Sequence, residues 1–442
     1  MQRGRYIFVL LAVAALFSSC EKGAESDFSW DDAWSNVFKG YMQFSTKVTT
    51  RVDKALNMRN REFGVLGYQY SGTTNWGTAK PLATPKVFYN QMVECGPTGI
   101  CTYDIDLSQA DNQLKQWEDN SRYAFFAYHP YGGTGITLSS ADAVGTPTLT
   151  YTYGWLGKAN GGTTIDACEE PTIFDLMTAE DIECDGSKNV AFDFKHRLFA
   201  VEVLANNYNE NVYEYEYEYK TDDAGNVVTD SEGNPQVKVD QYGNPVIKKD
   251  ENGNKVFKLD ANGDKICLKD NSQTIADLVL RIKGLKHTHM TIPLQDSEVD
   301  SNTQYTEGRV GDEDNKIVSF RMSNKNVYIP PFDELIVDTE DGTKQGGGYP
   351  TSISKYGSDG KKGYVMLIPQ GSSELEFALN WSWIKGGDDI NSANITNSLK
   401  SNMEFEAGKL YQIIINFVGS GVTIALIEAG SWDTKDVPYT FE

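Results

Sequence analysis

Short segments with alternating apolar and polar side chains recur along almost all of this 442-residue chain, separated by clusters of Gly, Pro, Asn and Asp. In residues 41–50, for example, Met42, Phe44 and Val48 share one face, as the inward residues of a half-buried strand do. Strands at this spacing are typical of β-sandwiches. With 24 Tyr, 20 Phe, 8 Trp and 40 Gly, the composition also favours strands and turns over helices. We therefore predict an all-β fold.

The strand series divides into two, and we place the boundary near residues 182–188. An N-terminal β-sandwich domain is predicted over residues 41–185 and a C-terminal one over residues 186–442. Two helical turns are expected within the first domain, at residues 139–143 and 175–181.

Residues 222–270 form a ten-residue repeat inside the second domain, with Asp at positions 230, 240, 250, 260 and 270 and Gly at positions 233, 243, 253 and 263. Each unit combines a turn with an extended piece, so we predict strand–turn–strand units in a protruding meander. The D-x-N-G motif also suggests calcium. An EF-hand loop needs Gly at its sixth position, however, and here Gly is fourth, so Asn-Gly turns explain the motif more simply.

The N-terminus has the layout of a bacterial lipoprotein export signal: a basic start, an apolar run from Ile7 to Phe17, two serines and Cys20. The 11-residue run is shorter than the roughly 20 residues that a membrane-spanning helix needs. We predict a signal peptide at residues 1–19, acylation of the Cys20 thiol (palmitate), and a tether at residues 20–40. The alternative is an ordinary secretory signal in which Cys20 is incidental.

The charge and the motifs argue against several functions. The formal charge of −22 repels phosphate backbones, so we predict no nucleic-acid partner. The chain contains no G-x-S-x-G, Walker, H-E-x-x-H or G-x-G-x-x-G motif. We therefore predict neither catalysis nor a cofactor.

The cysteines after Cys20 suggest disulfides, which export permits. Cys95 and Cys101 flank a turn, Cys168 and Cys184 are the next nearest pair, and Cys267 is left over. Free buried thiols are the alternative. His287 and His289 lie two residues apart, as metal ligands on one strand face do, but no cysteine lies nearby, and we predict no metal site.

Two tryptophans, Trp381 and Trp383, lie two residues apart on one predicted strand face. Such a pair can stack on sugar rings. Packing in the core of a sandwich explains the pair more simply.

An ordered series of motifs resembles the fimbrillins, the lipoprotein-derived type V pilins and related Mfa-like proteins of Gram-negative surfaces. The resemblance covers nearly the whole chain except residues 222–270. Its motifs are the segment ending in Cys20, FSTKVTTR (44–51), FGVLGY (63–68), Trp117 with FFAYHP (125–130), DLMTA (175–179), FDFKHRL (192–198), LIPQ (367–370), EAGKLY (406–411) and Trp432.

The resemblance implies two tandem transthyretin-like β-sandwich domains, the second carrying the repeat insertion. It also implies a structural or adhesive subunit of surface fimbriae, used for adhesion and biofilm formation and delivered to the outer membrane as a lipid-anchored precursor. Its partners would be other fimbrial subunits and an arginine-specific protease. Cleavage after an Arg that follows the first strand would remove that strand, and a strand from a neighbouring subunit would fill the groove.

The residues suit this mechanism. Arg51 bounds the first predicted strand, so one cut there frees it, with Arg59 and Arg61 as alternative sites. At the C-terminus, alternating apolar side chains form a candidate donor strand: Val437, Tyr439 and Phe441.

Other interpretations of the C-terminus stay open. The segment is equally suited to be the last strand of its own domain. The tail after Trp432 is only ten residues long and contains Pro438, which weakens strand pairing. These features argue against a stalk role, and a tip or accessory subunit, or an anchor that is never cut, fits as well. The alternative function is a non-polymerising surface lipoprotein that binds glycans through Trp381 and Trp383.

Overall fold

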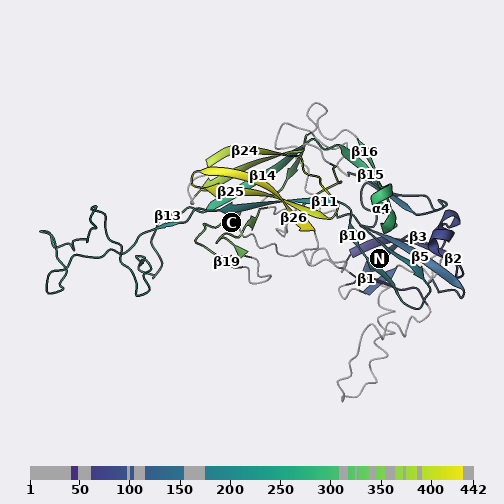
Figure 1. Ribbon diagram of the computed structural model, residues 1–442, viewed down its shortest axis with the longest axis horizontal. Helices are drawn as coiled ribbons and strands as arrows, with labels where there is room; N and C mark the ends of the chain where they lie inside the picture. The colour runs from purple at the N-terminus through teal and green to yellow at the C-terminus, as the bar shows by residue number, and fades with distance from the viewer. Residues whose placement is uncertain are drawn as a thin grey trace, which may run out of the picture.

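A computed structural model describes residues 41–47, 61–96, 100–103, 115–153, 175–307, 317–323, 326–337, 344–353, 364–371, 375–385 and 391–431. Strands dominate these residues, as predicted, and Figure 1 shows them gathered in sheets along the long axis of the molecule. The helices among the described residues are α3 (Trp76–Ala79), the 3-10 helix η1 (Lys80–Leu82) and α4 (Asp296–Asn302). None of them is long and apolar enough to span a membrane.

The first sheet contains eight of the described strands, in the order β10-β8-β5-β2-β3-β4-β1-β9. Their bounds are β1 Phe44–Lys47, β2 Arg61–Ser71, β3 Phe88–Cys95, β4 Ile100–Tyr103, β5 Ser121–His129, β8 Met177–Cys184, β9 Val190–Asp193 and β10 Lys195–His196. Strands β9 and β10 lie at opposite ends of this order, although only Phe194 separates them in the chain. The two edges of the sheet therefore come close together, and the sheet curls around a core of its own.

Further sheets complete the described structure. A four-stranded sheet has the order β16-β15-β7-β6, and two five-stranded sheets contain β21-β11-β25-β26 with β22 beside β11, and β17-β14-β23-β24 with β18 beside β14. The bounds are β6 Ile136–Leu138, β7 Thr148–Thr152, β11 Phe199–Asn207, β14 Gln273–Lys283, β15 His287–Pro293, β16 Gln304–Glu307, β17 Ile317–Arg321, β18 Val327–Ile329, β21 Thr351–Ser352, β22 Val365–Leu367, β23 Leu375–Lys385, β24 Asn391–Ser401, β25 Lys409–Val418 and β26 Gly421–Ser431. Two small pairs join β12 (Val212–Tyr213) to β13 (Cys267–Lys269) and β19 (Ile336–Val337) to β20 (Lys344–Gln345).

Two hydrophobic clusters fill the structure, and the first sheet contributes to both. On strand β5, Phe125 and Ala127 belong to the core inside the curled sheet, whereas Ala124 and Phe126 belong to the larger core. The larger core continues through β11, β14, β23 and β25, so it extends over both halves of the chain. The first sheet is thus covered on both faces.

Strands and contacts cross the predicted boundary at residues 185–186. Strands β9 and β10 pair with β1 and β8 of the first sheet, and β11, beginning at Phe199, is the first strand beyond it. In the other direction, β7 pairs with β15, so that Tyr151 lies opposite Met290. The two halves therefore share strands as well as a core.

The predicted helical turn at residues 175–181 is wrong. This segment enters β8, which pairs with β5 so that Met177 lies opposite His129. Leu176 belongs to the larger core and Met177 to the core of the first sheet, so both faces of the strand are buried. A strand buried on both faces loses the alternation of apolar and polar residues, which explains the misassignment. Residues 139–143 form a turn closed by the Ala143 N–H bond to the Ser140 carbonyl (3.0 Å), not a helix.

The repeats of residues 222–270 extend away from the sheets, beyond β13 at the far left of Figure 1. Successive arms pair across each turn, for example Val239 with Pro245, which confirms the predicted strand–turn–strand units. The arms also close onto the Tyr/Glu segment 213–221, a contact the sequence analysis missed. In one layer, Glu218 N–H donates to Val246 O (2.9 Å), Val246 N–H to Lys238 O (2.9 Å) and Lys238 N–H to Glu218 O (2.8 Å). Equivalent rings contain Lys220, Glu216 and Glu214 in place of Glu218.

Each turn of the repeat is closed by its own aspartate. Asp240 Oδ1 accepts the backbone N–H groups of Tyr242 (2.8 Å) and Asn244 (2.9 Å). These bonds hold the pKa of Asp240 below its usual value, and the bond from Asn244 has the largest effect. Gly243 has φ +85°, a conformation that residues with a Cβ rarely adopt. The carboxylates of the motif thus accept hydrogen bonds that close the turns, and its glycines adopt the backbone conformation that the turns need.

Trp381 is 1% exposed in strand β23 and belongs to the larger core. A ring at this depth has no face free for a sugar, so the interpretation of Trp381 as a glycan platform is wrong and the packing interpretation is confirmed for it. The side chain of Trp383 lies outside the described residues.

We expect Trp381→Ala to lower the free energy of unfolding by about 3–5 kcal/mol, because it removes a large buried side chain and leaves a cavity. Urea denaturation measures the loss. Leu82→Ala is the control, since Leu82 is 88% exposed and its truncation changes stability by about 0.5 kcal/mol or less. A similarly small loss for Trp381→Ala would contradict the packing role.

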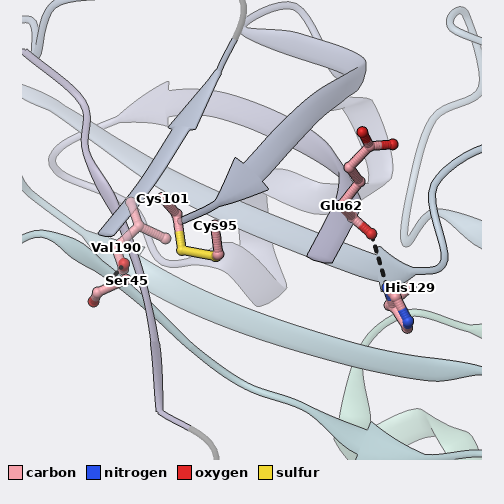
Figure 2. Close-up of a disulfide and its surroundings, with 6 residues drawn as sticks. All are labelled: Ser45, Glu62, Cys95, Cys101, His129 and Val190. Carbon is pink, nitrogen blue, oxygen red and sulfur yellow. Dashed lines mark hydrogen bonds between the residues drawn. A yellow bond between two sulfur atoms is a disulfide. The ribbon is translucent and has the colours of Figure 1, made fainter. Parts of the chain in front are cut away.

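His129 lies buried at the end of β5, where its Nδ1–H donates to the Glu62 carbonyl oxygen (2.8 Å; Figure 2). Burial lowers the pKa of this imidazole, and the Glu62 bond and the Asp175 charge offset only part of that effect. The folded state therefore binds fewer protons here than the unfolded state once the pH falls below the ordinary histidine value of about 6.5.

It follows that His129 stabilises the fold fully above about pH 6.5, and that this contribution is lost as the pH falls toward the folded-state pKa. We expect His129→Gln, which keeps an N–H donor, to reduce the fall in unfolding free energy between about pH 7 and pH 5. Urea denaturation across this range measures both slopes, with His289→Gln as a matched control. Equal slopes for the wild type and His129→Gln would contradict the assignment.

Candidate functional site

Strand β1 lies inside the first sheet rather than at its edge. It pairs antiparallel with β4, so that Phe44 lies opposite Cys101, and parallel with β9, so that Phe44 lies opposite Val190. These two neighbours are far apart in the sequence and meet only through β1 in the order of the sheet. Removal of β1 would therefore expose two backbone edges that face each other.

The Phe44 ring lies among four other aromatic rings. It meets Phe88 (5.7 Å between centroids), Tyr103 (5.8 Å) and Phe125 (5.9 Å) edge to face, and it stacks on Phe192 (5.8 Å). Such pairs stabilise beyond the area they bury. The ring is thus the part of β1 that the core of the first sheet encloses most fully.

Two side chains bury apolar surface where β1 and the residues just before it pack on the core of the first sheet: Met42, at 2% exposure, and Phe44, at 4%. At about 1.5–3 kcal/mol each, burying them contributes roughly 3–6 kcal/mol as an upper bound. Val48, the third apolar residue of the predicted strand, lies outside the described residues.

Backbone and side-chain hydrogen bonds fix the register of β1. Met42 N–H donates to the Lys115 carbonyl (2.8 Å), and Val190 N–H donates to the Gln43 carbonyl (3.0 Å). Ser45 Oγ donates to the Val190 carbonyl (3.2 Å), a bond that lies beside the disulfide in Figure 2. The strand is therefore held from both sides.

Cys95 and Cys101 form a disulfide, which the sequence suggested but left open against free buried thiols. It joins β3 to β4 directly beside β1, and Figure 2 shows the sulfur atoms close to Ser45 and Val190. Cys184 and Cys267 carry free thiols. Cys168, the predicted partner of Cys184, lies outside the described residues.

Several predicted site residues lie outside the described part of the chain: Cys20, Arg51, Arg59, Val437, Tyr439 and Phe441. Arg61 is the first residue of β2. The two paired histidines have local partners, since His287 Nδ1 lies 2.7 Å from the Pro369 carbonyl and His289 Nδ1 2.7 Å from Thr288 Oγ1. Among the described residues, no group of three or more His, Cys, Asp and Glu is arranged to hold a metal ion.

The role of β9 was not predicted from the sequence. Its Val190 and Phe192, with Phe194 beyond it, alternate with exposed residues and face the same core as Phe44. The alternation was visible in VAFDF (190–194), but a period-2 pattern does not identify the partner strand.

We expect Phe44→Ala to lower the free energy of unfolding by about 3–5 kcal/mol, since a buried aromatic ring is lost from a packed cluster. Thr46→Ala, at a partly exposed position in the same strand, is the matched control and should cost about 1 kcal/mol or less. Chemical denaturation and hydrogen exchange of the β1 amides measure the difference. Equal losses for the two variants would show that Phe44 does not anchor the strand.

The chain matches a family model that is described as fimbrillin-like. The match covers residues 49–307, which is more than half of the chain, and runs from just after β1 to the end of β16. The chain has no match among curated proteins.

Solved structures provide distant likenesses. The chain is similar to a fimbrial protein from Bacteroides vulgatus, at 14% identity over 88% of this chain and 99% of that one, with a TM-score of 0.45. It is also similar to two proteins named for a proposed role in cell adhesion. The one from Bacteroides ovatus has 13% identity over 90% of this chain and 99% of that one, with a TM-score of 0.41. The one from Bacteroides uniformis has 13% identity over 89% and 100%, with a TM-score of 0.34.

Proposed function

Since the chain belongs to the fimbrillin-like family, we propose that it assembles by exchange of its first strand. The family places it among the fimbrial and adhesive proteins of the cell surface rather than among the enzymes. In this proposal, cleavage after Arg51 releases β1, and a strand from a neighbouring subunit takes its place between β4 and β9. The observation that carries the proposal is the enclosure of Phe44 by four rings from other strands.

The position of β1 in the chain supports its release. It is the first strand among the described residues, and residues 48–60 separate it from β2. One cut in that connection leaves the chain from β2 onward continuous. The larger core, which contains no residue of β1, holds the other face of the first sheet, including Leu66 and Phe126. The cut subunit therefore keeps most of its packing.

The edges that β1 leaves behind suit a replacement strand. Unpaired strand edges are strong templates for β-augmentation, in which main-chain bonds supply affinity and side-chain pockets supply specificity. Here the pocket of Phe44 favours an aromatic side chain, with an apolar residue two positions earlier to replace Met42. The C-terminal segment fits this pattern, because Val437, Tyr439 and Phe441 alternate with Pro438 and Thr440.

The proposal also covers how the precursor is delivered to the outer membrane and which position the subunit takes in a fimbria. Acylation of Cys20 would tether the precursor to the outer membrane until the cut after Arg51 separates the tether from the subunit. A tip or accessory position and a stalk position are both compatible with this exchange. Arg59 and Arg61 would serve as cutting sites if Arg51 does not.

The decisive experiment treats the purified chain with an arginine-specific protease. We expect a product that begins at Val52, followed by ladders of non-covalent oligomers on gels run without boiling. Arg51→Ala is the control and should stay uncut at this position and monomeric. A cut product that remains monomeric would contradict strand exchange, and a product that begins at Asn60 or Glu62 would move the site to Arg59 or Arg61.

A second measurement tests the pocket. We expect a synthetic peptide of residues 41–51 to bind the cut subunit, and the same peptide with Phe44→Ala to bind about 10- to 100-fold more weakly, since burial of an aromatic side chain contributes about 1.5–3 kcal/mol. Fluorescence anisotropy gives both dissociation constants. A peptide with Thr46→Ala controls for general weakening, and equal affinity of the Phe44→Ala and unchanged peptides would exclude an aromatic pocket.

A further inference from the structure

We propose that the Cys95–Cys101 disulfide holds β4 in place as the acceptor edge for an incoming strand. The inference rests on the proposed strand exchange and assigns a positioning role to these two cysteines within it. Both are buried in the core of the first sheet, with Cys95 at 0% and Cys101 at 6% exposure.

Strand β4 is short and depends strongly on β1. It spans four residues, Ile100–Tyr103, and two of them, Ile100 and Cys101, lie opposite Ser45 and Phe44. Its other strand partner in the sheet is β3, through three pairs: Val93 with Tyr103, Glu94 with Thr102 and Cys95 with Cys101. Once β1 leaves, the pairing with β3 and the hydrogen bond that the Tyr103 hydroxyl accepts from Lys115 N–H (3.0 Å) remain to hold this edge.

Without β1, strand β4 would be a four-residue edge strand paired on one side only, with β3, which itself pairs with β2, and such weakly held edges open readily. The loss of β1 also removes Phe44 from the ring of Tyr103, which keeps its contact with Phe88 (5.3 Å between centroids). Fraying of β4 would remove the donors and acceptors that an incoming strand must meet. Each incoming strand would then have to order β4 as it binds, and the free-energy cost of this ordering would lower its affinity.

The disulfide lies at one of the three β3–β4 pairs and opposes such fraying. Cys101 is both the partner of Cys95 in the β3–β4 hairpin and the partner of Phe44 in the β1–β4 ladder. The covalent link thus ties β3 to the residue of β4 directly opposite the Phe44 pocket. Figure 2 shows this arrangement, with the two sulfur atoms beside the strand that carries Ser45. A preorganised edge binds its partner without first being ordered.

The test compares cut wild type with cut Cys95→Ser/Cys101→Ser, each binding the peptide of residues 41–51. We expect the double variant to bind at least about tenfold more weakly, and the amides of residues 100–103 to exchange faster in its cut form than in the cut wild type. In the uncut forms, where β1 still pairs with β4, the difference in exchange at these amides should be smaller. Cys184→Ser/Cys267→Ser removes two other thiols and is the matched control.

The outcomes separate the two proposals. Binding of the double variant within about twofold of the wild type, with unchanged exchange in β4, would overturn the role of the disulfide alone. Absence of peptide binding by the cut wild type would overturn strand exchange itself and this inference with it. If the double variant does not fold, the same comparison is made on folded, cut Cys184→Ser/Cys267→Ser protein, with the disulfide intact or reduced by a phosphine and alkylated.

Discussion

The insertion of β1 between β4 and β9 is the contact on which the first sheet depends. Its Phe44 packs against rings from β3, β4, β5 and β9. Its backbone pairs with β4 and β9, which begin at residues 100 and 190. The closure of the sheet around its core requires this connection. A strand of four residues thus determines whether the two edges beside it are paired or open.

The separation of the two cores limits the consequences of removing β1. Met42 and Phe44 belong to the core inside the first sheet, whereas Leu66, Phe126 and Leu176, on the opposite face of the same sheet, belong to the core that continues into the second half of the chain. The pairing of β7 with β15 adds a backbone connection between the halves. The sheet would therefore stay supported on one face if β1 left the other, a property that suits the proposed strand exchange.

Local patterns in the sequence predicted local structure well and distant pairing poorly. The two-residue period identified β1 with the buried Met42 and Phe44, the turn between Cys95 and Cys101 suggested a disulfide there but left free thiols open, and the ordered motifs indicated the family that the family model confirms. The parallel partner of β1, the strands shared across residue 185 and the closure of the repeat onto residues 213–221 were not predictable in this way. Periodicity reports which face of a strand is buried but not which strand lies beside it, and at β8 burial of both faces erased the pattern itself.

Under the proposed strand exchange, covalent attachment explains how a contact of modest strength can control assembly. The buried side chains of Met42 and Phe44 contribute at most roughly 3–6 kcal/mol, which alone corresponds to a dissociation constant between about 40 μM and several millimolar for a separate peptide. While β1 is part of the chain, its effective concentration is of millimolar order or higher, so it occupies the groove against an incoming strand. A cut in the connection to β2 removes that advantage at once without changing any contact in the groove. In the proposed exchange, donor strands that fill the Phe44 pocket and pair along β4 and β9 then compete on affinity alone, so that a single peptide bond, rather than a rearrangement of the fold, would control assembly.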